Sequence, residues 1–266
     1  MAKAVFVGLL TMAASLSFGQ EKGLVFAHRG GSKEFDENTL AAFRGSYEKG
    51  LRGFETDVRM TRDGELVILH DDKMERSYVG SGTVEAATAA ELRPVKTKKT
   101  GQPFLFLEDL LTYFSDKPGV YLEFEMKTSN TNLYPEARLE TYCKKLHDSA
   151  MAKRPAGSFY VFTSFDQRPL RIMKRLDPQA DLLLITGGAC SNEFVQAALT
   201  LGVKRVGCRV DLTSRAQVRA AQKAGLRVSC WPGRTVEDYE LGMALGADAL
   251  CSDIPVEIME WKNRAH

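Results

Sequence analysis

The feature that most constrains the fold is a regular alternation of short apolar runs with longer helical segments. Three of the helical segments end in a glycine just before the next apolar run, at Gly202, Gly225 and Gly246. Glycine is the commonest residue just beyond the end of a helix. Repeated strand–helix units are typical of a parallel sheet covered by helices. The chain is therefore predicted to be an α/β protein.

The element count favours a closed sheet. Eight strands are predicted near residues 24–27, 53–59, 120–125, 159–163, 182–185, 205–208, 227–230 and 249–251. Helices are predicted over 39–49, 107–114, 135–150, 167–176, 192–201, 214–224, 236–245 and from 256 onward. Asn38 is expected to cap the first helix and Gly50 to end it. Eight such units favour a TIM (β/α)8 barrel, with an open doubly wound sheet as the competing architecture.

The first residues have the pattern of an export signal. Lys3 precedes a short apolar stretch that ends in the small residues around Ser17-Phe18-Gly19. This pattern predicts a signal peptide over residues 1–19 and an exported protein, periplasmic or secreted. An uncleaved N-terminal anchor is the alternative. Residues 20–266, roughly 247 in number, match the usual size of one barrel domain.

Composition excludes several classes of partner. The formal net charge is +2, so no global field favours nucleic acid or an anionic surface, and no later stretch is apolar enough to predict a stable membrane span. The five cysteines are widely spaced, without a C-x-x-C pair. Cys208, Cys230 and Cys251 are interpreted as core residues, although one internal disulfide stays open. The expected partner is a small molecule, and the pattern does not indicate an oligomeric state.

Two histidines and three acids suggest a catalytic site. His28 and His70 each end an apolar run, where α/β folds place their chemistry. Glu55 and Asp57 are two residues apart on a predicted strand, so their carboxylates lie on the same side, and Glu125 occupies a similar place on a later strand. Three carboxylates favour Mg²⁺ or Ca²⁺ over zinc. The alternative is a buried network of these acids with arginines.

The positive charges near these residues suit a phosphate group. Arg29 follows His28, and Lys127 follows Glu125 on the same side of the strand. Two imidazoles beside a cation suit a reaction in which one group takes a proton and the other gives one. An insertion is predicted between His70 and residue 107. It either walls the site or forms a solvated loop.

In order and spacing, several motifs resemble the glycerophosphodiester phosphodiesterase family. They are His28-Arg29-Gly30, Glu37-Asn38-Thr39-Leu40, Glu55-Thr56-Asp57-Val58, Asp63-Gly64, Leu69-His70-Asp71, Arg76, Gly82-Thr83-Val84, Glu125-Met126-Lys127, Thr163-Ser164-Phe165-Asp166, Val228-Ser229-Cys230-Trp231 and Ser252-Asp253-Ile254-Pro255. The resemblance implies a TIM barrel that hydrolyses glycerophosphodiesters, in glycerol and lipid metabolism, to glycerol 3-phosphate and an alcohol with a divalent cation.

The resemblance also assigns roles to individual residues. It implies Glu55, Asp57 and Glu125 as metal ligands and His28 and His70 as the acid/base pair. Arg29 and Lys127 would bind phosphate oxygens, and Trp231 would pack against the glycerol or the leaving alcohol, unless it is a structural residue of the rim. The glycerol 2-hydroxyl would attack phosphorus to give a cyclic phosphate, with direct attack by water as the rival route. Glu37 and Asn38 are expected to brace the first loop.

The chain departs from the family pattern at four places that are expected to border the pocket. They are Asp36, Asp72, Tyr78-Val79 and Pro232-Gly233-Arg234. These departures leave the identity of the alcohol open. One alternative is a related barrel phosphodiesterase acting on lysophospholipids or phosphoinositide-type headgroups, and another is a binding protein for phosphodiesters that does not catalyse.

Overall fold

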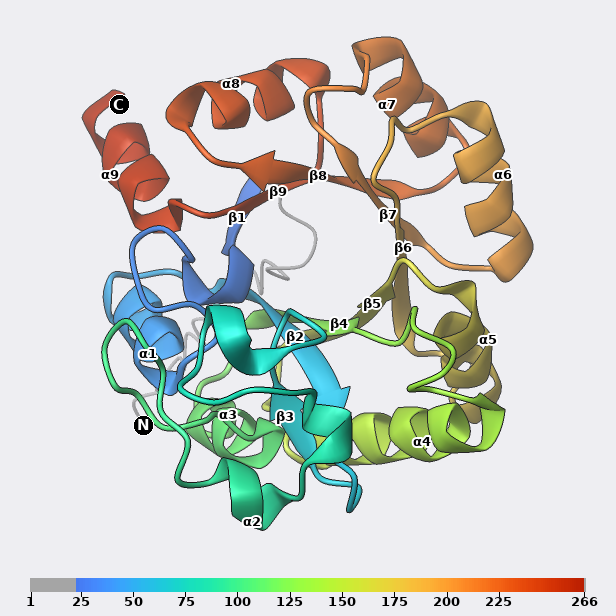
Figure 1. Cartoon of the computed structure of the whole chain (residues 1–266). Coiled ribbons are helices and arrows are strands. Elements are labelled where there is room, and N and C mark those ends of the chain that lie inside the picture. The colour runs from blue at the N-terminus through green and yellow to red at the C-terminus, as the bar shows by residue number, and fades with distance from the viewer. Residues whose placement is uncertain (1–22, 266) are drawn as a thin grey trace, which may run out of the picture.

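The computed structural model describes residues 23–265 as a closed barrel of parallel strands (Figure 1). The strands of the ring are β1 (Leu24–Ala27), β2 (Gly53–Met60), β4 (Tyr121–Met126), β5 (Phe159–Ser164), β6 (Asp181–Ile185), β7 (Arg205–Arg209), β8 (Arg227–Gly233) and β9 (Ala249–Ser252). Pairing of Ala27 with Phe54 joins β1 to β2 and closes the ring. The predicted TIM barrel is confirmed. The predicted signal peptide, residues 1–19, lies outside the described residues.

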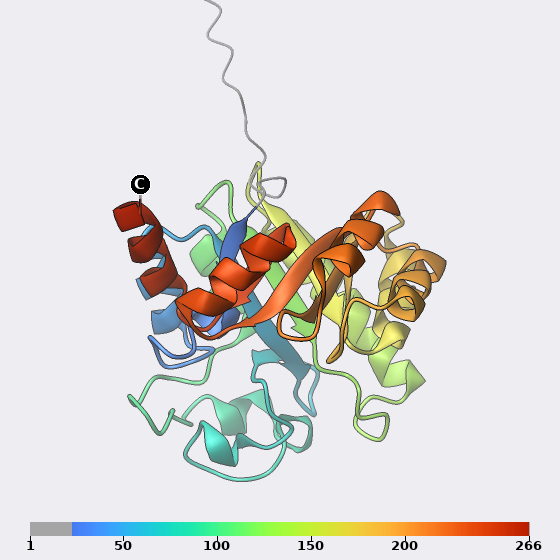
Figure 2. The same cartoon turned by 90° about the horizontal axis from the view of Figure 1, so that it is seen from above.

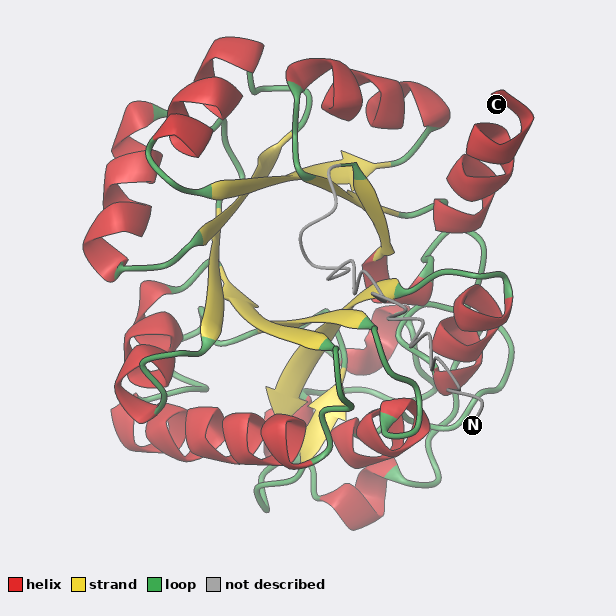
Figure 3. Ribbon diagram, turned by 180° about the vertical axis from the view of Figure 1, so that it is seen from behind, coloured by secondary structure: helices red, strands yellow, loops and turns green. Residues whose placement is uncertain are grey.

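Helices surround the ring on its outer side (Figure 3). They are α1 (Leu40–Glu48), α3 (Leu107–Phe114), α4 (Glu136–Ala152), α5 (Gln167–Leu176), α6 (Asn192–Leu201), α7 (Arg215–Lys223), α8 (Val236–Leu245) and α9 (Pro255–Ala265). One predicted cap is wrong. Thr39, and not Asn38, caps α1, because its hydroxyl accepts a hydrogen bond from the backbone N–H of Ala42 at 3.1 Å. The side chain of Asn38 is committed elsewhere, to Asp57.

Apolar packing holds the two layers together. Phe43 of α1, Phe54 of β2 and Phe114 of α3 form an aromatic cluster between strands and helices, with ring centroids 5.0–6.4 Å apart. A smaller cluster that includes Phe26, Tyr121 and Leu183 fills the barrel interior. Each fully buried side chain of this kind stabilises the fold by roughly 1.5–3 kcal/mol. The interior cluster forms the floor on which the polar residues of the site lie.

One short strand runs outside the ring. β3 (Leu66–Ile68) pairs antiparallel with the end of β2, with Val58 opposite Ile68. The apolar run before His70 was interpreted as ending at the edge of a buried parallel sheet. Instead it turns back beside β2, because the tight turn at Asp63-Gly64 reverses the chain, and Gly64 has a positive φ of 89°. His70 therefore reaches the site from an irregular segment.

The residues after His70 form the predicted insertion, which projects beyond the barrel (Figure 2). It contains two short 3₁₀ turns, η3 (Met74–Arg76) and η4 (Val84–Ala86), and one helical turn, α2 (Ala89–Leu92). Its buried side chains form their own small core, in which the rings of Tyr78 and Phe104 stack with centroids 4.2 Å apart. A packed core of this kind excludes the solvated-loop interpretation of the insertion.

Two further expectations concern membrane-spanning helices and the cysteines. Among residues 23–265, no helix combines the length and the apolar character that crossing a bilayer requires. Cys143, Cys190, Cys208 and Cys230 are buried free thiols, as expected of core residues, whereas Cys251 is partly exposed.

Candidate active site

The three predicted acids meet inside the barrel at its C-terminal end. Asp57 on β2 lies directly opposite Glu125 on β4, and Glu55 is two residues earlier on the same side of β2. Each of the three offers one carboxylate oxygen, and these oxygens lie within 4.8 Å of one another. All three side chains are buried. The carboxyl ends of parallel strands thus bring three acids together from two neighbouring strands.

The electrostatics of this cluster fit a bound cation. Burial raises the pKa of Glu55 well above its usual range, and repulsion from Asp57 and Glu125 raises it further. Burial acts in the same direction on Asp57, yet Lys127 and Arg29 hold the pKa of that carboxyl below its usual range. Oε1 of Glu55 and Oδ1 of Asp57 are buried without a hydrogen-bond partner. Buried oxygens without partners are expected where a cation completes the site.

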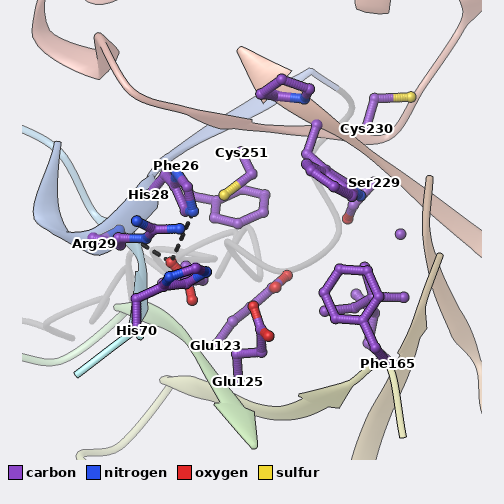
Figure 4. Close-up of a pocket in the computed structure, with 16 residues that line it drawn as sticks. Phe26, His28, Arg29, His70, Glu123, Glu125, Phe165, Ser229, Cys230 and Cys251 are labelled. Carbon is purple, nitrogen blue, oxygen red and sulfur yellow. Dashed lines mark hydrogen bonds and ion pairs between the residues drawn. The ribbon is translucent and has the colours of Figure 1, made fainter. Parts of the chain in front are cut away.

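His28 is fixed by a carboxylate from the other end of the chain. It follows β1 in the turn η2 (His28–Gly30), and Asp253 follows β9, the neighbouring strand of the ring. His28 Nδ1 and Asp253 Oδ1 are 2.6 Å apart, and the hydroxyl of Ser32 donates to the same oxygen at 2.7 Å. Nε2 of His28 lies 3.9 Å from Oε2 of Glu55 (Figure 4). The imidazole is therefore oriented with Nε2 toward the acids.

His70 is held in the same way by its sequence neighbour. Its Nδ1 lies 2.6 Å from Oδ1 of Asp71, while Oδ2 of Asp71 accepts from the guanidinium of Arg76. Burial lowers the pKa of His70, and the positive charges of Lys127 and Arg29 lower it further against the attraction of Asp57. Figure 4 shows the rings of His28 and His70 on either side of Arg29 at one edge of the pocket. Both histidines are thus bound to a carboxylate at Nδ1, which leaves Nε2 available to a ligand.

Two cations contact the acid cluster. Arg29 has a left-handed backbone, with φ 52° and ψ 31°, a conformation that is costly for a residue other than glycine and is often found at functional sites. Its Nε lies 3.3 Å from Oδ2 of Asp57, and its backbone N–H donates to Glu55 at 3.0 Å. Nζ of Lys127 lies 2.7 Å from Glu125 and 3.7 Å from Asp57. Both charges are placed to attract an anion that approaches the acids.

The opposite wall of the pocket is apolar. It is formed by Phe165, Leu183, Ile185, Trp231 and Pro232, which come from the ends of β5, β6 and β8. The rings of Phe165 and Trp231 meet edge to face, with centroids 5.8 Å apart and planes at 90°. A ligand in this pocket would therefore have a charged side facing the histidines and acids and an apolar side facing the aromatic rings.

The comparison with known proteins identifies the family. A model of the glycerophosphoryl diester phosphodiesterase family matches residues 28–257, which span nearly the whole barrel. The chain belongs to this family. It is therefore an enzyme of the phosphodiesterase class. The resemblance drawn from the sequence motifs is confirmed.

Individual relatives of this phosphodiesterase cover almost its full length. A glycerophosphodiester phosphodiesterase of Caldanaerobacter subterraneus is 28% identical over 240 residues, which are 88% of this chain and 95% of the relative. A phosphodiesterase from Oleispira antarctica, solved with the product sn-glycerol-3-phosphate, is 22% identical with a TM-score of 0.82, covering 94% and 99% of the two chains. A glycerophosphodiester phosphodiesterase from Parabacteroides distasonis has a TM-score of 0.74 at 20% identity, covering 93% and 100%.

The structure brings all eight predicted site residues of this phosphodiesterase to one end of the barrel. His28, Arg29, Glu55, His70, Glu125 and Trp231 line one pocket. Asp57 completes the acid cluster with Glu55 and Glu125, and Lys127 contacts both Asp57 and Glu125. Roles were not predicted for Asp71 and Asp253, the partners of the two histidines. Asp253 directly follows the last strand, so its position at a strand end was a usable signal. For Asp71, the usable signal was its position directly after His70 in the sequence.

Two of the four family departures do not border the catalytic pocket. Asp36 accepts hydrogen bonds from the hydroxyls of Thr97 and Thr100, and Tyr78 packs in the insertion core. Asp72 pairs with Arg59 at 2.6 Å, beside His70. Pro232 lines the pocket. The insertion was predicted either to wall the site or to form a solvated loop, and among the described residues that line this pocket none comes from 71–106.

Proposed function

We infer that this phosphodiesterase hydrolyses glycerophosphodiesters to glycerol 3-phosphate and an alcohol. The observation that carries the inference is a pair of imidazoles, each oriented by a carboxylate on Nδ1, beside three buried acids. Membership of the family and the fold shared with the product-bound Oleispira enzyme support it. Paired proton carriers beside a cation site are the arrangement that hydrolysis of a diester needs.

The acids would hold a divalent cation with a preference for oxygen, Mg²⁺ or Ca²⁺. Glu55, Asp57 and Glu125 supply three carboxylates without a nitrogen or sulfur donor, which favours these ions. A cation bound there would lower the pKa of a coordinated hydroxyl and offset charge on the phosphate. The cation also explains why three buried acids are kept so close together in spite of their mutual repulsion.

The two histidines would divide the proton transfers. The charge of Asp71 is shared with the guanidinium of Arg76, whereas the described partners of Oδ1 of Asp253 are His28 and a serine hydroxyl. Burial, together with the charges of Lys127 and Arg29, lowers the pKa of His70 and so favours its neutral, proton-accepting form. On this basis His70 takes the proton from the attacking hydroxyl, and His28 gives a proton to the leaving alcohol oxygen. The attacking group is the glycerol 2-hydroxyl, which yields a cyclic phosphate that water then opens to glycerol 3-phosphate, or it is water directly.

The remaining residues bind the substrate. Arg29 and Lys127 would contact phosphate oxygens as charge develops on them, because both guanidinium and ammonium already face the acids. Trp231, with Phe165 against its ring, would pack on the carbon atoms of the glycerol or the alcohol. The predicted signal peptide would export the enzyme, to the periplasm or out of the cell.

The test is a panel of glycerophosphodiesters assayed for released glycerol 3-phosphate, with and without a chelator. Turnover that the chelator abolishes and Mg²⁺ or Ca²⁺ restores is expected. His28→Ala and His70→Ala should each lose most turnover while keeping the affinity for the cation. Near-parental rates in both variants would overturn the assignment, and tight binding of the diester without turnover would indicate the non-catalytic binding protein.

A second candidate function follows from the apolar wall. Phe165 is 40% exposed at the mouth, next to Trp231 and Pro232. An exposed aromatic at a pocket mouth suits an acyl chain as well as a small alcohol. A related activity on lysophospholipids is therefore the alternative. Turnover that appears with micellar lysophospholipid and is absent with soluble glycerophosphodiesters would favour it.

A further inference from the structure

His70 lies on a segment that neither a strand nor a helix holds in place. The pairing of β3 with β2 ends at Ile68, and the next described backbone bond is from the N–H of Leu69 to the carbonyl of Asp57, at 3.1 Å. The ring is tied at Nδ1 to Asp71, which is itself in the irregular segment. A hydrogen bond to the adjacent residue fixes the ring relative to its own loop. It does not fix the loop relative to the acids.

Arg59 supplies that connection from inside the protein. It is on β2, two residues after Asp57 on the same side of the strand, and is 2% exposed. Its Nε donates to the carbonyl of Leu69 at 3.2 Å, and one terminal nitrogen donates to the carbonyl of His70 at 2.9 Å. The same nitrogen donates to Asp72 at 2.6 Å. One planar guanidinium thus binds three of the four residues of the segment Leu69–Asp72.

The insertion fixes the orientation of this guanidinium. Oε1 of Glu85, a buried residue of η4, accepts from the second terminal nitrogen of Arg59 at 3.0 Å and from the hydroxyl of Tyr134 at 2.8 Å. The hydroxyl of Tyr134 in turn accepts from the backbone N–H of Met60 at 3.0 Å. Figure 1 shows the insertion in front of β2 and β3. Arg59 is therefore held between Glu85 of the insertion and the segment Leu69–Asp72.

A buried ion pair of this kind is a poor way to gain stability. Desolvation of both ions opposes the Coulomb attraction, so apolar residues of similar volume often stabilise a core at least as well. Its distinctive property is geometric, since a guanidinium fork fixes several acceptors at once in one plane. All the acceptors of Arg59 other than Glu85 belong to the segment Leu69–Asp72.

We propose that Arg59, oriented by Glu85 of the insertion, is the positioning residue that holds the His70 segment at the acid cluster. The insertion then contributes to the reaction through this buried pair, without touching the substrate. The proposal rests on the proposed role of His70 in proton transfer. It also accounts for Asp72 at the place where the family pattern has proline, because Asp72 provides another acceptor for Arg59.

The first test is Arg59→Lys, which keeps the charge and most of the volume but loses the fork. It should lower kcat about 10- to 100-fold, as expected when a group that orients a catalytic side chain is lost. KM should stay close to its wild-type value, because Arg29 and Lys127 are untouched. Glu85→Gln is a milder variant that should lower kcat in the same direction by a smaller factor.

Arg138→Lys is the matched control. Arg138 also donates to backbone carbonyls at the end of β2, those of Met60 and Thr61 at 2.7 and 2.9 Å, but it makes no recorded bond to the His70 segment. A general loosening of β2 would affect both lysine variants alike. Arg138→Lys is therefore expected to keep kcat near the wild-type value even where its melting temperature falls.

Two further measurements separate positioning from stability. In a His70→Ala background, Arg59→Lys should cause no additional loss of turnover, because the residue acts through His70. By NMR, the ring-proton resonances of His70, which report where the ring lies relative to Arg29 and the acids, should shift or broaden in Arg59→Lys and stay unchanged in Arg138→Lys. The NMR experiment reports position without turnover, so it decides the proposal even if wild-type enzyme fails to hydrolyse any glycerophosphodiester, a result that would refute the proposed function instead.

The proposal is wrong if Arg59→Lys and Glu85→Gln retain wild-type kcat with an unchanged His70 resonance. It is equally wrong if Arg59→Lys lowers turnover by the same factor in the presence and absence of His70. An effect of Arg138→Lys equal to that of Arg59→Lys would show that the loss of turnover follows strand stability alone.

Discussion

Replacement of Asp253 by asparagine isolates the contribution of one carboxylate to the action of His28. The change keeps the side-chain volume and removes the charge that faces Nδ1 at 2.6 Å. A hydrogen bond between a charged group and its partner contributes about 1.5–3 kcal/mol. At about 1.36 kcal/mol per factor of ten, this predicts a decrease in kcat of roughly 10- to 150-fold. The carboxylate is 15% exposed, so solvent screens it weakly.

The assay is release of glycerol 3-phosphate from a soluble glycerophosphodiester at saturating cation. Ser32→Ala is the matched control, because it removes the other hydrogen bond to the same oxygen and leaves the charge in place. The hydroxyl of Ser32 does not contact the imidazole, so its loss should reach His28 only through Asp253, and the control should lose less kcat than Asp253→Asn. If Asp253→Asn lost no more activity than Ser32→Ala, the charge of Asp253 would have no role in proton transfer, and the reasoning about His28 would fail.

Three other predictions follow from the site. Glu55→Gln combined with Asp57→Asn should weaken the binding of Mg²⁺ and Ca²⁺ in calorimetry, and unchanged affinity would exclude this cluster as the cation site. If His28 is the acid, His28→Ala should regain much of its lost rate on a glycerophosphodiester with a weakly basic aryl leaving group, because such a group leaves without being protonated, while His70→Ala should not. Equal recovery of both variants would contradict the division of roles. Burial raises the pKa of Glu123 to about 7, so its stabilising protonated form is present at low pH and is lost as pH rises through 7. In chemical unfolding at pH 8, the free energy of unfolding of the wild-type enzyme should therefore be lower than that of Glu123→Gln by on the order of 3 kcal/mol. At pH 4 the two free energies should be equal. Equal stability at both pH values would show that Glu123 titrates normally.

Several strand positions in the ring could be predicted because two local signals agreed at them. An apolar run followed a helix that ended in glycine, as at Gly202, Gly225 and Gly246, and both signals arise from nearest neighbours in the chain. The three acids could be placed for the same reason. The spacing of Glu55 and Asp57 along β2 sets the side of the strand on which they lie. The parallel register of β2 and β4 then places Glu125 beside Asp57, at the same height along the strands.

The first helix cap shows where local signals compete. Asn38 and Thr39 are both good cap residues, and sequence alone gives no reason to choose Thr39. The choice is made by tertiary contacts. The amide of Asn38 donates to Asp57 at 2.7 Å, and this bond draws the side chain away from α1 and toward the acids. A residue with two suitable partners takes the one that satisfies a buried charge.

The segment that carries His70 was beyond prediction for a different reason. Its apolar run, Leu66–Ile68, has the composition of a barrel strand, and composition does not state whether a strand joins the ring or pairs outside it. The outcome depends on the turn at Gly64 and on Arg59, whose acceptors become known only once the insertion has folded beside β2. Arg59 in sequence is one more polar residue on an alternating strand. Its buried position follows from Glu85, 26 residues later, because a guanidinium enters a protein interior only where a carboxylate and several carbonyls are already arranged to receive it.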